Sequence, residues 1–130
     1  MNKFILGSLL LSNIVFAATP QEQCKSNGVD YAVAKKFVVE FKEGLSHKNA
    51  KKLAKFMDYP VRVNGPNNSH YTIKSKASFI KEFPQLFNEQ SVQAILNDNE
   101  IFCNAQGAML GNGKIWYHTY GDKAMIFVIN

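Results

Sequence analysis

The stretch from Ile101 to Ile129, IFCNAQGAMLGNGKIWYHTYGDKAMIFVI, decides the fold of this chain. Two short apolar runs in it are separated by Gly107, which indicates a bulge or a close approach of two backbones. Gly111-Asn112-Gly113 is typical of a tight hairpin turn, and Gly121-Asp122 marks a second turn. The stretch therefore predicts an antiparallel meander, and its last strand, 123–129, is apolar enough to lie inside the sheet.

Helical patterns precede this meander. We expect Asp30 to cap a long helix, and Asn49 to cap a second, shorter helix that Pro60 ends. Alternation of apolar and polar residues in 61–63 and 71–73 predicts two short strands that pair as a hairpin. The buried side of the long helix is predicted from apolar residues that recur at helical spacing: Ala34, Phe37, Val38, Phe41 and Leu45.

A third helix is predicted to start at Ser75 or Ser78, with an aromatic-rich stripe that we interpret as core. Pro84 lies within this stripe and should kink the helix or restart it. Residues 90–96 fit a helix or a strand, because their length favours neither.

The order of these elements, helices first and strands later, predicts an α+β domain. The N-terminal helices would pack on a curved, mainly antiparallel sheet and leave a concavity between the two layers. The chain has 130 residues, which allows one domain. We expect this domain over 30–130, after a polar lead-in segment at 18–29.

Residues 1–17 are interpreted as a secretory signal peptide. Lys3 precedes a short apolar core, and β-branched or small residues stand at Val15 and Ala17. We therefore expect the mature protein in the periplasm or secreted, with no integral membrane span, because no later segment is long and apolar enough. In such a compartment the two cysteines, Cys24 and Cys103, could form a disulfide. The alternative is two separate thiols.

The formal net charge is +5, and all but one of the 15 Lys and Arg residues are lysines. Many of the lysines lie between residues 35 and 55. They form either a solvated helical face or a contact for an acidic protein or an anionic membrane surface. An exported chain whose only arginine is Arg62 is not expected to bind nucleic acid.

Candidate ligand-binding residues lie in the predicted strands. Arg62 could present its guanidinium group to a carboxylate or a phosphate, or it could be a structural partner of Asp58 or face solvent. Alternation puts Trp116 and His118 on one face of their strand, as a ligand wall, as an acid/base site, or as a core aromatic and an exposed histidine. The predicted ligand-binding residues are Tyr59, Arg62, Met109, Trp116 and His118.

Motifs for other chemistry are not recognisable. The sequence has no metal-ligand spacing, no Ser-His-Asp set and no phosphate-binding loop, so we predict no cofactor and no metal site. Asn104 and Gln106 flank Gly107, and we expect them to tie the bulge rather than to orient a ligand.

Four segments carry a resemblance to a known superfamily: 58–63, 73–80, 84–87 and, most specifically, 102–116. In this order they resemble the nuclear transport factor two-like superfamily, and the chain is similar to small exported bacterial proteins within it over residues 30–130. The resemblance implies a cone-shaped α+β fold with an interior cavity, often a dimer through the sheet, and no particular reaction. The catalytic sets of enzymatic members have no match here, so no catalytic residue is carried over.

Three functions remain open. We favour a non-enzymatic exported protein that holds a small apolar or amphipathic ligand in the cone cavity. The alternative is a module that binds another envelope protein, such as a toxin-neutralising immunity protein or a modulator of an envelope enzyme. The third is a dehydratase- or isomerase-type enzyme with Asp58, Tyr59 or His118 as acid or base, which requires these groups to converge inside the cavity.

Overall fold

The computed structural model describes residues 17–130, and all of the predicted signal peptide except Ala17 lies outside this part of the chain. The elements follow one another as α1 (Pro20–Ser26), α2 (Tyr31–Ser46), α3 (Ala50–Leu53), the 3-10 helix η1 (Ala54–Phe56), β1 (Met57–Asn64), β2 (His70–Ile73), α4 (Lys76–Leu86), α5 (Glu89–Leu96), β3 (Phe102–Asn104), β4 (Gly107–Leu110), β5 (Ile115–Tyr120) and β6 (Lys123–Ile129). None of the helices in this part of the chain has the length and apolar character needed to cross a membrane.

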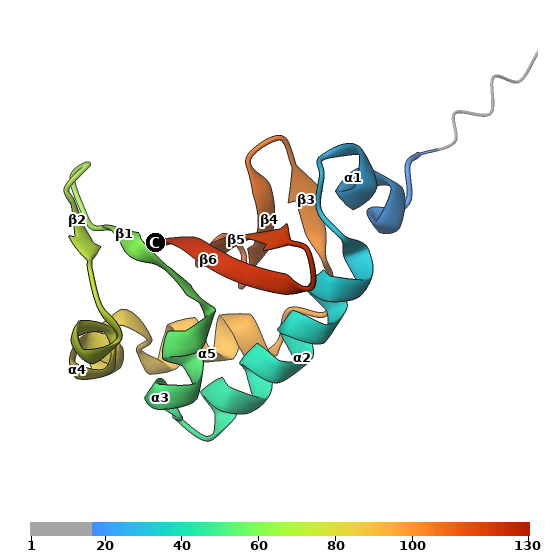
Figure 1. The fold of residues 1–130 in the computed structure, drawn as a ribbon. Helices are drawn as coiled ribbons and strands as arrows, with labels where there is room; N and C mark the ends of the chain where they lie inside the picture. The colour runs from blue at the N-terminus through green and yellow to red at the C-terminus, as the bar shows by residue number, and fades with distance from the viewer. Residues whose placement is uncertain (1–16) are drawn as a thin grey trace, which may run out of the picture.

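The strands form one six-stranded sheet in the order β2-β1-β6-β5-β4-β3. The sheet is curved and open, and α2 to α5 lie along one side of it (Figure 1). We call the side covered by these helices the inner face and the opposite side the outer face. Neighbouring strands are antiparallel except for β1 and β6, which are parallel. The predicted α+β class is confirmed, and β6 lies inside the sheet as expected.

Side-chain caps set the start of the main helices. The Asp30 carboxylate accepts a hydrogen bond at 3.1 Å from the backbone amide three residues further along α2. Asn49 caps α3 in the same way. Ser75, rather than Ser78, caps α4. Residues 90–96, for which the sequence left helix and strand open, belong to helix α5.

The prediction made from Pro60 was wrong, and of the two alternatives for Pro84 the structure excludes the restart. Pro60 does not end the second helix, because strand β1 already begins at Met57 and carries Pro60 inside it. The register of β1 against β6 shifts between Met57 and Arg62, where the proline has no N–H to donate to the ladder. Pro84 does not restart α4, which runs through it to Leu86. The missing N–H of Pro84 therefore affects only the last turn of this helix.

The polar lead-in contains a helix that the sequence did not predict. Thr19 caps α1, and Pro20 occupies its first position, where a missing N–H costs no helical hydrogen bond. Helix α1 lies beside β3, the edge strand (Figure 1). Cys24 of α1 and Cys103 of β3 are both buried and form a disulfide, as predicted. The bond ties the N-terminal segment to the edge of the sheet.

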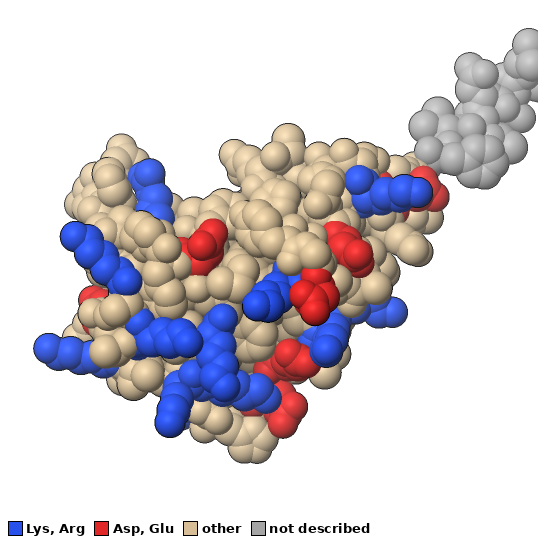
Figure 2. All heavy atoms as spheres, in the orientation of Figure 1, with Lys and Arg blue, Asp and Glu red and all other residues tan. Residues whose placement is uncertain are grey.

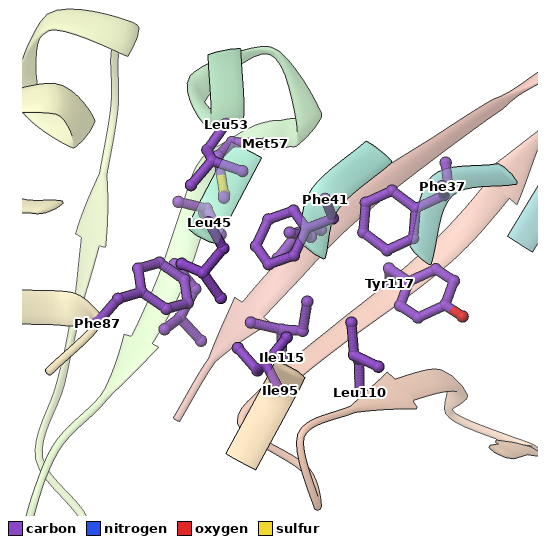
Figure 3. Close-up of a cluster of buried hydrophobic side chains, with 14 of the residues drawn as sticks. Phe37, Phe41, Leu45, Leu53, Met57, Phe87, Ile95, Leu110, Ile115 and Tyr117 are labelled. Carbon is purple, nitrogen blue, oxygen red and sulfur yellow. The ribbon is translucent and has the colours of Figure 1, made fainter. Parts of the chain in front are cut away.

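Aromatic side chains fill the space between α2 and the inner face. The ring centroid of Phe37 lies 5.4 Å from that of Phe41 and 4.5 Å from that of Tyr117. Ile115 and Leu110 from the sheet lie against these rings (Figure 3). The Tyr117 hydroxyl is buried and has no hydrogen-bond partner in the described part of the chain. The deep part of the concavity is therefore occupied by the protein's own side chains.

Candidate functional site

Residues of β5 alternate between the two faces of the sheet. Ile115 and Tyr117 are buried on the inner face, whereas Trp116 and His118 are half-buried on the outer face. The alternation predicted from the sequence is confirmed. Because the helices cover the face of Tyr117, Trp116 and His118 lie outside the concavity between the helices and the sheet.

Three of the five predicted ligand-binding residues form one row across the outer face. Arg62 and Trp116 both pair with Val128 in the sheet register, and Trp116 also pairs with Met109. His118 lies on the same face, further along β5. Four of the five predicted residues therefore share the outer face, on β1, β4 and β5.

Tyr59, the fifth predicted residue, lies apart from the others. It is half-buried near the core, and its hydroxyl donates a hydrogen bond to the carbonyl oxygen of Ala54 at 2.7 Å. Burial raises the pKa of Tyr59 to about 12. The hydrogen bond from the phenol links β1 to the preceding 3-10 helix.

A hollow of about 450 Å³ in the outer face brings Arg62 and Trp116 together. These two residues are the only arginine and the only tryptophan of the chain. Half-buried apolar side chains and amide side chains complete the lining. We call this site the outer hollow, and its other lining residues are Asn64, Gln106, Phe127, Val128 and Asn130.

Amide side chains hold Arg62 in place within the outer hollow. Arg62 Nε donates a hydrogen bond to Asn64 Oδ1 at 2.7 Å, and Asn64 Nδ2 donates to Asn130 Oδ1 at 2.8 Å. Asn130 Nδ2 in turn donates to the carbonyl oxygen of Gly113 at 2.6 Å. Within residues 17–130 no carboxylate lies within 4.0 Å of the guanidinium group, so Arg62 does not form the predicted alternative pair with Asp58.

The turn between β3 and β4 forms one wall of the outer hollow. Asn104 Oδ1 accepts a hydrogen bond from the backbone N–H of Gln106 at 2.8 Å, so Asn104 stabilises this turn as expected. Gly107 follows with a φ of 134°, and a Cβ atom built on it would lie 2.9 Å from the carbonyl oxygen of Tyr117. The predicted close backbone approach at Gly107 is confirmed, and it brings Gln106 to the edge of the hollow.

The groups considered for acid/base catalysis do not converge inside the concavity. Asp58 is exposed on β1, and His118 faces the outer side of the sheet. The Tyr59 hydroxyl is engaged with the backbone of Ala54. Since an acid/base site needs its groups within reach of one common point, this arrangement gives the enzyme hypothesis no support.

A second hollow opens between α2 and the start of β6, at the edge of the concavity. Its volume is about 440 Å³, and its walls come from α2, η1, the first turn of α4 and the β5–β6 turn. We call it the α2–β6 cleft. Its apolar lining residues are Val33, Phe37, Phe56, Ala124 and Met125.

Charged side chains border the α2–β6 cleft. Two acidic residues, Glu40 and Asp122, are outnumbered by four lysines. Figure 2 shows basic side chains gathered on this side of the molecule, toward the end formed by α3 and α4, with fewer acidic ones among them. The four lysines of the rim are Lys36, Lys55, Lys76 and Lys123.

Most of the rim lysines lack a carboxylate partner. Lys36 Nζ and Glu40 Oε1 lie 4.0 Å apart on the exposed surface of α2. An exposed ion pair of this kind contributes little to stability. In the described part of the chain, Lys55, Lys76 and Lys123 have no carboxylate within 4.0 Å. The cleft therefore combines an apolar floor with a rim in which positive charges outnumber negative ones.

No local pattern in the sequence singles out the α2–β6 cleft. The sequence assigns Phe37 to the core and interprets the lysines as a solvated helical face or a contact surface. Lys123 and Met125 lie far along the chain and reach the cleft only through the position of β6. The concentration of lysines between residues 35 and 55 was the sequence feature that could have indicated the basic rim of the cleft.

Among residues 17–130, no group of three or more His, Cys, Asp or Glu residues is placed to hold a metal ion. No protein-family model, curated protein or solved structure matches this chain. The two hollows are therefore the features of the molecule from which a function can be inferred.

Proposed function

We propose that this protein is an exported, non-enzymatic binding protein that holds a small amphipathic ligand in the α2–β6 cleft. The ligand places its apolar body on Val33, Phe37 and Phe56 and its anionic end against the lysines of the rim. One observation carries the proposal: within residues 17–130, an apolar floor and three lysines without a carboxylate partner meet in one cleft of about 440 Å³.

The dimensions and chemistry of the cleft support a small ligand. Sites for small molecules have volumes of roughly 300–1,000 Å³ and combine apolar walls with a few polar groups. Each square ångström of apolar surface that the ligand and the cleft bury contributes about 25 cal/mol. Lysine is a mobile point charge without fixed geometry, so the rim selects for negative charge rather than for one shape of anionic group.

Two features support export of the mature protein to the periplasm or the medium. The predicted signal peptide at 1–17 directs export. The disulfide between Cys24 and Cys103 is of a kind that persists in oxidising compartments.

The resemblance to the nuclear transport factor two-like superfamily implies a cavity between helices and sheet, and the α2–β6 cleft lies at the edge of that space.

The direct test compares two amphiphiles that differ in the sign of their charge. Decanoate and decyltrimethylammonium are titrated into the isotopically labelled mature protein, and backbone amide shifts are followed by NMR. We expect decanoate to shift the amides around Val33, Phe37 and Phe56 in a saturable way and to bind several-fold more tightly than the cation. Equal binding of both amphiphiles, or shifts that avoid these residues, would refute the proposal.

Variants of the rim show whether the lysines act as proposed. The double variant Lys55→Gln/Lys123→Gln removes two positive charges from the cleft. It should weaken decanoate binding by about threefold for each lysine, which lies within the range of about 0.2–1 kcal/mol for exposed ion pairs. Lys81→Gln removes an exposed lysine of α4 outside the cleft and is the matched control. Native mass spectrometry of protein purified from its own compartment would then identify the co-purified ligand.

A second candidate function is the binding of another envelope protein through the outer face. It is favoured by apolar side chains that remain accessible there, with Phe102 of β3 41% exposed and Tyr120 of β5 56% exposed. Substituting Phe102 and Tyr120 by serine would weaken such an interface and leave decanoate binding unchanged. Cross-linking to a protein partner in the native compartment, lost in this double variant, would favour the second candidate.

A further inference from the structure

We propose that the outer hollow is a recognition site for a carboxylate group carried by an apolar molecule or segment. The carboxylate pairs with the Arg62 guanidinium group, and the apolar carrier lies on Trp116. This site is separate from the α2–β6 cleft, with which it shares no lining residue. The inference therefore does not depend on the function proposed for the cleft.

The hydrogen-bond network orients the guanidinium group before a ligand arrives. Arg62 uses its Nε to bond Asn64 Oδ1 at 2.7 Å, and Asn64 is held in turn by Asn130. Since Asn64 is a neutral acceptor, the positive charge of Arg62 stays uncompensated, and no carboxylate lies within 4.0 Å of it in residues 17–130. A guanidinium group that is fixed at one edge and lacks a counter-ion can form charge-assisted hydrogen bonds through its remaining donors.

The sheet register places an apolar surface beside this charge. Arg62 and Trp116 flank Val128 in one cross-strand row, so their backbones are two strand spacings, or about 10 Å, apart. Phe127 and Val128 line the hollow between them and are half-buried. A ligand that reaches from Arg62 to Trp116 therefore crosses apolar side chains.

The charged side chains of the outer hollow favour a monoanion. Arg62 is the only charged side chain in its lining, which otherwise consists of amide and apolar side chains. A phosphate dianion would bring two negative charges against one positive charge in a partly desolvated site. A carboxylate carries one charge, and its two oxygens match the parallel N–H donors of a guanidinium group.

Trp116 provides the measurement, because it is the chain's only tryptophan and lines the hollow. Its fluorescence is titrated with 3-phenylpropionate and with the neutral isostere 3-phenylpropanamide. We expect a saturable change with the carboxylate at a dissociation constant at least about tenfold below that of the amide, as for the loss of a hydrogen bond to a charged group. Equal affinities, or no change with either compound, would overturn the proposal.

Variants separate the carboxylate site from general charge effects. Arg62→Gln should reduce the affinity for 3-phenylpropionate by about tenfold or more, with unchanged circular dichroism. Asn64→Asp provides an internal carboxylate for Arg62 and should weaken binding although the arginine is present. Lys81→Gln removes one exposed positive charge outside both hollows and is the matched control, for which binding should stay unchanged. Wild-type affinity in the Arg62→Gln variant would overturn the assignment.

The carboxylate can come from a small molecule or from the end of a peptide chain, and a second titration distinguishes these sources. A hexapeptide that ends in phenylalanine with a free carboxylate is compared with the same peptide as its C-terminal amide. Tighter binding of the free peptide than of 3-phenylpropionate assigns the site to protein termini, and weaker binding assigns it to small molecules. A peptide amide that binds as well as the free peptide would contradict carboxylate recognition.

Discussion

Substitution of both Cys24 and Cys103 by alanine should destabilise the fold strongly without removing its secondary structure. The disulfide spans 79 residues, and a cross-link of this length restricts the unfolded chain by about 4.5 kcal/mol in the chain-entropy model. Helix α1 has only seven residues, which is too short for independent stability, so it depends on this attachment and on packing beside β3. We therefore expect the free energy of unfolding to fall by about 4 kcal/mol.

The assay is urea unfolding of residues 18–130, followed in parallel by far-ultraviolet circular dichroism and by Trp116 fluorescence. In thermal unfolding the same loss should lower Tm by about 15–20 °C for a domain of this size. Wild-type protein under a reducing agent should unfold at the same urea concentration as the double variant, because both lack the cross-link. A loss below about 1 kcal/mol in a variant that retains its helical signal would refute the reasoning, since the entropic contribution would then be absent.

Three further predictions concern backbone geometry and buried tyrosines. Gly107→Ala should cost about 2 kcal/mol or more in urea unfolding, because a side chain at a φ of 134° is strained and its Cβ would lie 2.9 Å from the Tyr117 carbonyl oxygen; wild-type stability would contradict this. Tyr117→Phe should leave the free energy of unfolding unchanged or raise it by about 1 kcal/mol, because it removes a buried hydroxyl without a partner among residues 17–130. A decrease in the free energy of unfolding of about 1 kcal/mol or more would show that the hydroxyl forms a hydrogen bond in solution. Burial raises the pKa of Tyr59 from 10.0 to about 12 and also raises that of Tyr117. Between about pH 10 and pH 12 the native state therefore keeps protons that the unfolded chain releases. The urea midpoint should fall as the pH rises through this range. A midpoint that stays constant over this range would contradict the burial of both phenols.

Local patterns predicted much of the fold because the decisive signals were short-range. The Gly-Asn-Gly turn at 111–113 and the apolar run at 123–129 define the meander from their own residues. Asp30 and Asn49 cap helices as expected, since a cap depends only on the amide three residues later. The prediction that Pro60 ends a helix was wrong, because a proline can stand inside a strand at a position where the sheet needs no backbone donor. Whether a donor is needed depends on the neighbouring strand, here β6, which the local sequence does not reveal.

The candidate site was harder to predict because it depends on which face the helices cover. Alternation showed that Trp116 and His118 share one face and that Ile115 and Tyr117 share the other. Both faces carry aromatic side chains, so hydrophobicity alone does not choose between them. The α2–β6 cleft is a juxtaposition of distant segments, and no window of the sequence contains both its floor and its rim.

The position of β6 has a consequence for the order in which the sheet can form during synthesis. The hairpin of β1 and β2 joins the rest of the sheet only through β6, which is the last of the described strands to leave the ribosome. Until residues 123–129 are available, the early hairpin has no strand on which to dock, and the β3–β5 meander has an open edge. A nascent chain that still lacks residues 123–129 therefore holds two separate pieces of sheet, and the strand that joins them is the last of the described strands to be made.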